Sequence, residues 1–189
     1  MRRILSRQEE DKKKKRNQFL VGGILALLMI LSTLGYAFRN EFSGGTESIT
    51  YNGFQFVKQG NLWFTSVGSL QFAFRYHPAE TENISSNFFL SLNNYNGKSL
   101  YISSENYDAE IEIYRNLDQI VLRRQYACLE NQTCEENFPI KTCIDNFIVI
   151  KEGNNSRITQ QDNCVFIEGK KEELARMADK FLYKILGVS

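Results

Sequence analysis

The sequence predicts an α+β protein in which an N-terminal single transmembrane helix precedes an antiparallel sheet packed with two amphipathic helices. Three observations support this prediction. Residues 19–38 form a stretch without charged side chains, and apolar and polar residues alternate between 49 and 77. Apolar residues then recur at steps of three and four in two later segments. About 150 residues follow the apolar stretch, which is enough for one domain with its own hydrophobic core.

The apolar stretch is the first element of the chain. Its 20 residues match the length that a helix needs to cross about 30 Å of hydrocarbon. Five consecutive basic residues, 12–16, come shortly before it, and the positive-inside rule places such a flank in the cytoplasm. We therefore expect a basic cytoplasmic tail over 1–18 and a signal-anchor in the lipid bilayer over 19–38. The rest of the chain then lies outside the cell membrane.

A cleavable signal peptide is the alternative interpretation of this stretch. Gly35, Tyr36 and Ala37 offer small residues at the spacing that a signal peptidase reads, so cleavage after Ala37 would release the outer domain. The charged leader of 18 residues is long for a signal peptide, and the apolar run continues past Leu31, which favours an uncleaved anchor. A buried soluble helix is the third interpretation, and the basic flank argues against it.

A polar linker and a strand-rich region come next. Residues 39–48 contain a Gly-Gly pair and suit a short tether, so we assign the extracytoplasmic α+β domain to 49–189. The alternation between 49 and 77 is typical of half-buried strands, and turn signals such as Asn-Gly separate them, which predicts an antiparallel meander. Pro78 ends it because proline cannot donate a hydrogen bond to a neighbouring strand. Residues 99–103 are a further expected strand.

Two helices and a hairpin complete the expected domain. Apolar residues at helical spacing predict an amphipathic helix over 108–129. The same spacing predicts a final helix from Leu174 to Ile185, after which a glycine occupies the C-cap position. Residues 146–151 and 163–168 are strand-like, and the Gly-Asn-Asn turn between them predicts a hairpin.

Four cysteines lie on the outer side of the proposed anchor, at Cys128, Cys134, Cys143 and Cys164. Their spacing fits neither a paired zinc pattern nor a thioredoxin-like motif, and an even count in an exported domain indicates two disulfides. Cys143 and Cys164 are nearly symmetric about the turn of the expected hairpin. We therefore predict that they pair with each other and that Cys128 pairs with Cys134. Free buried thiols in a cytosolic protein are the alternative.

Three N-x-S/T sequons lie in predicted loops on the exported side, at Asn83, Asn131 and Asn154. Their position permits glycosylation. We expect no cofactor, no metal and no catalytic residue.

Other polar and aromatic residues offer weaker candidates. His77 is the single histidine, and the sequence shows no nucleophile or carboxylate to partner it. Trp63 fits a core or membrane-interface position better than a recognition site. Glutamates near the first cysteine pair fit a solvated loop better than a cation site; they are Glu130, Glu135 and Glu136.

Charge and motifs narrow the classes of function. From residue 39 onward the chain has 15 basic and 19 acidic side chains, and nucleic-acid binding needs clustered positive charge, so we expect no nucleic-acid partner. Neither a Ser-His-Asp arrangement nor a glycine-rich phosphate loop can be assembled. We expect a single-pass protein whose outer domain is a binding or scaffolding module, as a subunit of an envelope complex with an unknown envelope protein.

Two other functions stay open. One is an envelope enzyme with an unrecognised site. The other is a pilin-like surface subunit, although a processing site before the apolar stretch and an acidic residue early within it are both missing.

The second half of the chain also carries a resemblance. The segments RRQYACLENQTC, FPIKTC, DNCVFIEG and DKFLYKILGV, within about 100–189, resemble uncharacterised membrane-anchored archaeal proteins. The resemblance implies a small exported domain with paired cysteines and no assigned activity, and it assigns no functional residue.

Overall fold

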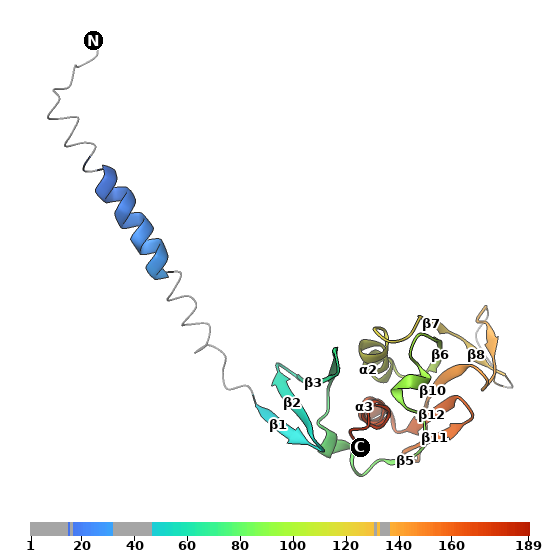
Figure 1. The fold of residues 1–189 in the computed structure, drawn as a ribbon. Helices are drawn as coiled ribbons and strands as arrows, with labels where there is room; N and C mark the ends of the chain where they lie inside the picture. Colours follow the sequence, from blue (N-terminus) through green and yellow to red (C-terminus); the bar gives the residue numbers. More distant parts are fainter. Residues whose placement is uncertain (1–14, 16, 32–46, 131, 133–136) are drawn as a thin grey trace. The chain divides into compact units, whose positions relative to one another are not determined.

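A computed structural model describes residues 15, 17–31, 47–130, 132 and 137–189, and the chain divides into two units, Met1–Thr46 and Glu47–Ser189 (Figure 1). In the first unit, residues 17–31 are helical with exposed side chains. Within the described ranges, no helix has both the length and the apolar character needed to cross a membrane. Residues 32–46, which include the end of the predicted anchor and most of the predicted linker, lie outside the described residues.

The second unit begins with a four-stranded antiparallel sheet, which confirms the predicted meander. Neighbouring strands pair in chain order, and left-handed turn residues, including Gly53 and Gly60, connect them. Glycine favours such turns because it lacks a Cβ atom. The strands are β1 (Ser48–Tyr51), β2 (Phe54–Gln59), β3 (Leu62–Val67) and β4 (Leu70–Phe74).

A larger six-stranded sheet follows, with the strand order β5-β11-β12-β10-β6-β7. Four of the six strands, β12, β10, β6 and β7, run parallel to one another. The strand β11 is antiparallel to β12, and β5 is parallel to β11. The strands are β5 (Ser85–Asn87), β6 (Ser99–Ser104), β7 (Arg123–Tyr126), β10 (Asn146–Glu152), β11 (Arg157–Gln161) and β12 (Cys164–Gly169). Two very short strands, β8 (Cys128–Leu129) and β9 (Ile140–Lys141), pair with each other to form the β8–β9 ribbon.

Two α-helices, α2 (Tyr107–Leu117) and α3 (Leu174–Ile185), complete the unit, and α3 confirms the predicted final helix. Short 3-10 turns cover Pro78–Thr81, Leu92–Asn94 and Lys171–Glu173. The unit is therefore an α+β fold that contains an antiparallel sheet, as the sequence predicts.

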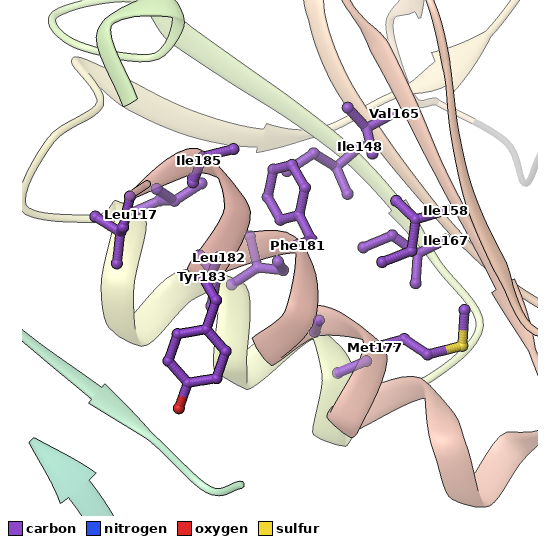
Figure 2. Close-up of a cluster of buried hydrophobic side chains, with 14 of the residues drawn as sticks. Leu117, Ile148, Ile158, Val165, Ile167, Met177, Phe181, Leu182, Tyr183 and Ile185 are labelled. Atoms are coloured by element: carbon purple, nitrogen blue, oxygen red, sulfur yellow. The ribbon is translucent and has the colours of Figure 1, made fainter. Parts of the chain in front are cut away.

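Helix α3 lies between the two sheets, so almost all of its side chains are buried (Figure 1). Phe181 and Met177 point toward the large sheet, where they meet isoleucines and Val165 (Figure 2). Tyr183 points the other way, and its ring lies 4.2 Å from that of Phe74 and 5.8 Å from that of Phe56 in the small sheet. Because one helix contacts both sheets, the two sheets share a single hydrophobic core.

The opposite face of the large sheet has a second, smaller core. It contains Tyr101, Phe147, Val149 and Cys164 from the strands, together with Leu129 from β8. The β8–β9 ribbon therefore covers part of this face, which we call the ribbon face. The helices cover the other face.

The helix predicted over 108–129 is too long, because α2 ends at Leu117. The carbonyl oxygen of Leu117 accepts hydrogen bonds from the N–H groups of both Ile120 and Val121, and the chain then turns into β7. Ile120 is buried in that turn, so it extends the helical spacing of apolar residues without continuing the helix. All four residues of β7 are exposed, so no alternation marks this strand in the sequence.

The hairpin predicted between 146–151 and 163–168 is also wrong. The strands β10 and β12 occupy these positions, but they pair in parallel, with Phe147 opposite Cys164. The strand β11 lies between β10 and β12 in sequence. It pairs with β12 in the antiparallel direction and is not a neighbour of β10. The sequence did not predict β11, because its polar residues weaken the alternation of apolar and polar side chains; they are Arg157, Gln160 and Gln161.

Candidate functional site

The predicted disulfide between Cys143 and Cys164 is present, with Cα atoms 4.9 Å apart. Cys143 lies just before β10 and Cys164 begins β12, so the parallel pairing brings them to the same edge of the sheet. The N–H of Asn163 donates to the carbonyl oxygen of Cys143 at 3.0 Å and reinforces this edge. The described part of the chain contains no free cysteine. Cys134 lies outside the described residues, so its pairing with Cys128 stays a prediction.

Two of the three sequons can be placed. Asn83 is exposed in the turn before β5, and Asn154 is exposed between β10 and β11, whereas Asn131 lies outside the described residues. Asn154 also borders a shallow depression of about 470 Å³ at the carboxyl edge of the parallel strands. The other residues that line this depression are Glu152, Gly153, Lys170 and Lys171. A glycan at Asn154 would project from its rim.

His77 lies among aromatic rings rather than in a polar site. Its ring centroid is 5.1 Å from that of Trp63, 5.9 Å from that of Tyr51 and 6.1 Å from that of Phe56. Its Nδ1 accepts a hydrogen bond from the N–H of Ala79, which caps the turn at Pro78–Thr81. Trp63 is itself buried, which fits the core position expected for it.

These contacts favour the neutral form of the His77 imidazole. Burial lowers its pKa, and protonation of Nδ1 would also break the hydrogen bond from Ala79. A ring that must accept at one nitrogen carries its proton on the other nitrogen, Nε2, which is buried here. His77 therefore serves to join the small sheet to the following turn.

A cluster of polar side chains on the ribbon face, which we call the Arg123 cluster, is the site that the sequence did not predict. Arg123 on β7 donates from Nε to Ser99 Oγ at 3.1 Å and from Nη2 to the hydroxyl of Tyr101 at 3.2 Å. Lys141 on β9 places its ammonium 4.3 Å from the centroid of the Tyr101 ring. Three separate strands therefore bring two cations to one phenol.

The electrostatics of the cluster are positive. Hydrogen bonding from Lys141, followed by that from Arg123, lowers the pKa of the Tyr101 phenol. Lys141 pairs with one carboxylate, that of Asp145, at 3.7 Å from its Nζ. Such a group of donors suits an anion, and a phenol with a lowered pKa also marks a functional-site candidate.

Part of the Arg123 cluster was visible in the sequence. Ser99 and Tyr101 alternate in the expected strand at 99–103, so they share a face. Arg123 was hidden because the helix predicted to 129 placed it on a solvated helical face, and Lys141 comes from a ribbon of only two residues per strand. A metal-binding group is absent from the part of the chain that the structure describes.

No protein-family profile matches the chain, and neither a curated protein nor a solved structure matches it at a significant level. The resemblance of residues 100–189 to membrane-anchored archaeal proteins stays an expectation.

Proposed function

We propose that this chain is a single-pass membrane protein whose extracytoplasmic domain binds a partner in the cell envelope. In this proposal, residues 1–18 form the cytoplasmic tail, 19–38 the membrane anchor, 39–48 a linker and 49–189 the outer domain. The observation that carries the proposal is the disulfide between Cys143 and Cys164, because disulfides persist in oxidising compartments outside the cytosol. The basic flank of the apolar stretch supports the same orientation.

The surface around β7 and β9 supports a binding role. The strands β7 and β9 also carry the exposed side chains of Tyr126 and Ile140, and Phe138 is exposed nearby. The hydroxyl of Tyr126 donates to Glu110 of α2, so Tyr126 lies on the helix side of β7, opposite Arg123. The rings of Tyr126 and Phe138 lie 5.9 Å apart. Exposed aromatic side chains are enriched where proteins bind one another, so this pair of rings suits a protein partner.

Site-directed labelling on intact cells tests the orientation. Single cysteines are introduced as Ser6→Cys in the tail and Ser189→Cys at the exposed C-terminal residue. We expect a membrane-impermeant maleimide to label Ser189→Cys only, and we expect alkaline carbonate to leave the full-length chain in the membrane pellet. The unsubstituted protein controls for labelling of the native cysteines.

Two results would contradict this proposal. Labelling of Ser6→Cys in place of Ser189→Cys would reverse the orientation. A mature N-terminus at Phe38, with the domain released from the membrane, would identify the stretch as a signal peptide instead of an anchor.

A further inference from the structure

We propose that the Arg123 cluster is a binding site for an oxyanion, a phosphate-type or carboxylate group, held by Arg123, Lys141 and the hydroxyl of Tyr101. The inference deepens the proposed function and rests on it for where the ligand is met, outside the membrane. The anion can be free in solution or carried by a lipid headgroup, and the chemistry of recognition is the same in both cases.

Arg123 differs from every other arginine that the structure describes. Each of the others has a carboxylate oxygen within 3.5 Å, whereas no carboxylate of the described residues pairs with Arg123. The paired arginines are Arg75, Arg115, Arg124, Arg157 and Arg176. In a domain with more acidic than basic side chains, an arginine without such a partner has its charge available for a ligand.

Neutral hydroxyls fix the guanidinium of Arg123. Ser99 Oγ and the Tyr101 hydroxyl each accept one of its five N–H groups, so three N–H groups remain for a ligand. Ser99 lies directly opposite Arg123 in the parallel pairing of β6 and β7. Two hydroxyls of the adjacent strand β6 thus orient the guanidinium without neutralising its charge. This fixed orientation lowers the entropic cost of binding an anion.

Lys141 and Tyr101 complete a set of hydrogen-bond donors. The ammonium of Lys141 comes from the β8–β9 ribbon, and Asp145 offsets its charge only in part, at 3.7 Å. The Tyr101 hydroxyl accepts from Arg123, so its own hydrogen can be donated to a ligand. The lowered pKa of Tyr101 reports the positive potential at this point. A cluster that offers donors and net positive charge selects an anion over a cation or a neutral group.

Calorimetric titration of the full-length protein in phosphatidylcholine nanodiscs, with inorganic phosphate at low ionic strength, tests the site. We expect one phosphate per chain, weakened about tenfold or more by Arg123→Gln, since charge-assisted hydrogen bonds are lost. Lys141→Gln removes a positive charge that comes from β9 instead of β7, and it should weaken phosphate binding by about threefold or more. Removing the nearby carboxylate by Asp145→Asn should instead strengthen binding by about twofold or more.

The adjacent arginine provides the matched control. Arg124 points to the helix face, where it pairs with Asp118 at 3.0 Å and lies over the ring of Tyr114. Arg124→Gln therefore removes the same charge from the next position of the same strand, and we expect phosphate affinity to stay within about twofold of the unsubstituted protein. Circular dichroism and the intact Cys143–Cys164 disulfide verify the fold of each variant.

Nanodiscs that contain phosphatidylglycerol separate the two sources of the anion. If a headgroup occupies the site, phosphate should bind more weakly in these discs, and Arg123→Gln should remove the difference; if the anion is free, phosphate should bind equally in both. Absence of phosphate binding, or equal losses in Arg123→Gln and Arg124→Gln, would overturn the site. The titration of purified protein tests the anion site, and the labelling on cells tests the membrane orientation. Either experiment can fail while the other succeeds.

Discussion

Two carboxyl groups are completely buried beside each other, at Asp179 in α3 and Glu112 in α2, each 0% exposed. One oxygen of Asp179 accepts the N–H groups of Arg75 and Tyr76, at 3.0 and 2.8 Å. The other oxygen of Asp179 makes no hydrogen bond to the described residues, and Oε1 of Glu112 has only the Arg75 guanidinium near it, with Nε at 3.3 Å. Repulsion between two neighbouring buried carboxylates favours a state in which one of them keeps its proton.

The proton belongs mainly to Asp179. Burial, and then the negative charge of Glu112, raises the pKa of Asp179 well above its usual value. Glu112 is the better anion because Arg115 lies 2.6 Å from it and Arg75 lies 3.3 Å from it, although burial also raises its pKa. The folded protein therefore binds a proton that the unfolded chain releases near pH 4.

We predict that Asp179→Asn flattens the pH dependence of stability. With a raised folded-state pKa, the contribution of Asp179 is fully present below about pH 4 and is lost as the pH rises through the folded-state pKa. Asparagine keeps both backbone hydrogen bonds and can donate to Glu112 at any pH. Urea unfolding between pH 4 and 8 should show a free energy of unfolding that falls less with pH in the variant than in the unsubstituted protein.

Asp108→Asn is the control for this prediction. Its side chain is 61% exposed and lies 3.5 Å from Arg75, so removing its charge should leave the slope with pH unchanged. An Asp179→Asn variant that keeps the full slope would show that the pair does not share a proton in the folded state.

At the scale of elements, side chains from the helices replace a missing strand along β4. Among the described strands none pairs with the outer edge of β4, and alternate residues of β4 bond to helical or near-helical side chains instead. The Asn116 amide accepts from the N–H of Ala73 and donates to its carbonyl oxygen, both at 2.8 Å. Gln119 donates to the carbonyl oxygen of Gln71 on one side, and Asp179 accepts from Arg75 on the other. The small sheet is thereby joined to the helices through its edge.

We predict that Asn116→Ala destabilises the domain by about 2–4 kcal/mol, because it leaves the buried N–H and C=O groups of Ala73 without partners. The loss should appear as a lower urea midpoint. Gln119→Ala removes two hydrogen bonds, to the carbonyl oxygens of Gln71 and Asn116, from an exposed side chain, and it should cost less than about 0.5 kcal/mol. Equal effects of the two substitutions would contradict the assignment of Asn116 as the partner of this edge.

The elements that the sequence predicted are those whose burial is one-sided or complete. The meander alternates most clearly where one face of a strand is buried, as in β3, and α3 shows the helical spacing of a helix packed on both sheets. The strand β7 has no buried residue and β11 has one, so neither left a periodic signal. The Arg123 cluster was missed for the same reason, since its arginine lies on the strand without a pattern.

At the scale of the whole molecule, the pairing of Cys143 with Cys164 was predicted correctly from an incorrect arrangement. A hairpin brings together residues that are symmetric about its turn, whereas the parallel pair β10 and β12 brings together residues at their two starts. Here both arrangements place the same two cysteines in contact. Strand direction depends on long-range pairing, which the local pattern of residues does not contain.

The two disulfides should stabilise the domain to different extents. The Cys143–Cys164 bridge spans 21 positions and encloses both β10 and β11, and the chain-entropy model gives roughly 3 kcal/mol for a loop of this length. The predicted Cys128–Cys134 loop is shorter and should contribute less. The double substitution Cys143→Ser/Cys164→Ser should therefore lower the melting temperature further than Cys128→Ser/Cys134→Ser.

Peptide mapping of the native protein without reduction checks the connectivity on which this comparison depends. The Cys143–Cys164 bridge also affects the Arg123 cluster. Cys143 is two residues from Lys141, so the bridge holds the end of the β8–β9 ribbon near the ribbon face. Removing it should also weaken phosphate binding at the Arg123 cluster, by freeing Lys141. A bridge from Cys128 to Cys143 or Cys164, or four free thiols in protein taken from the native membrane, would refute both expectations.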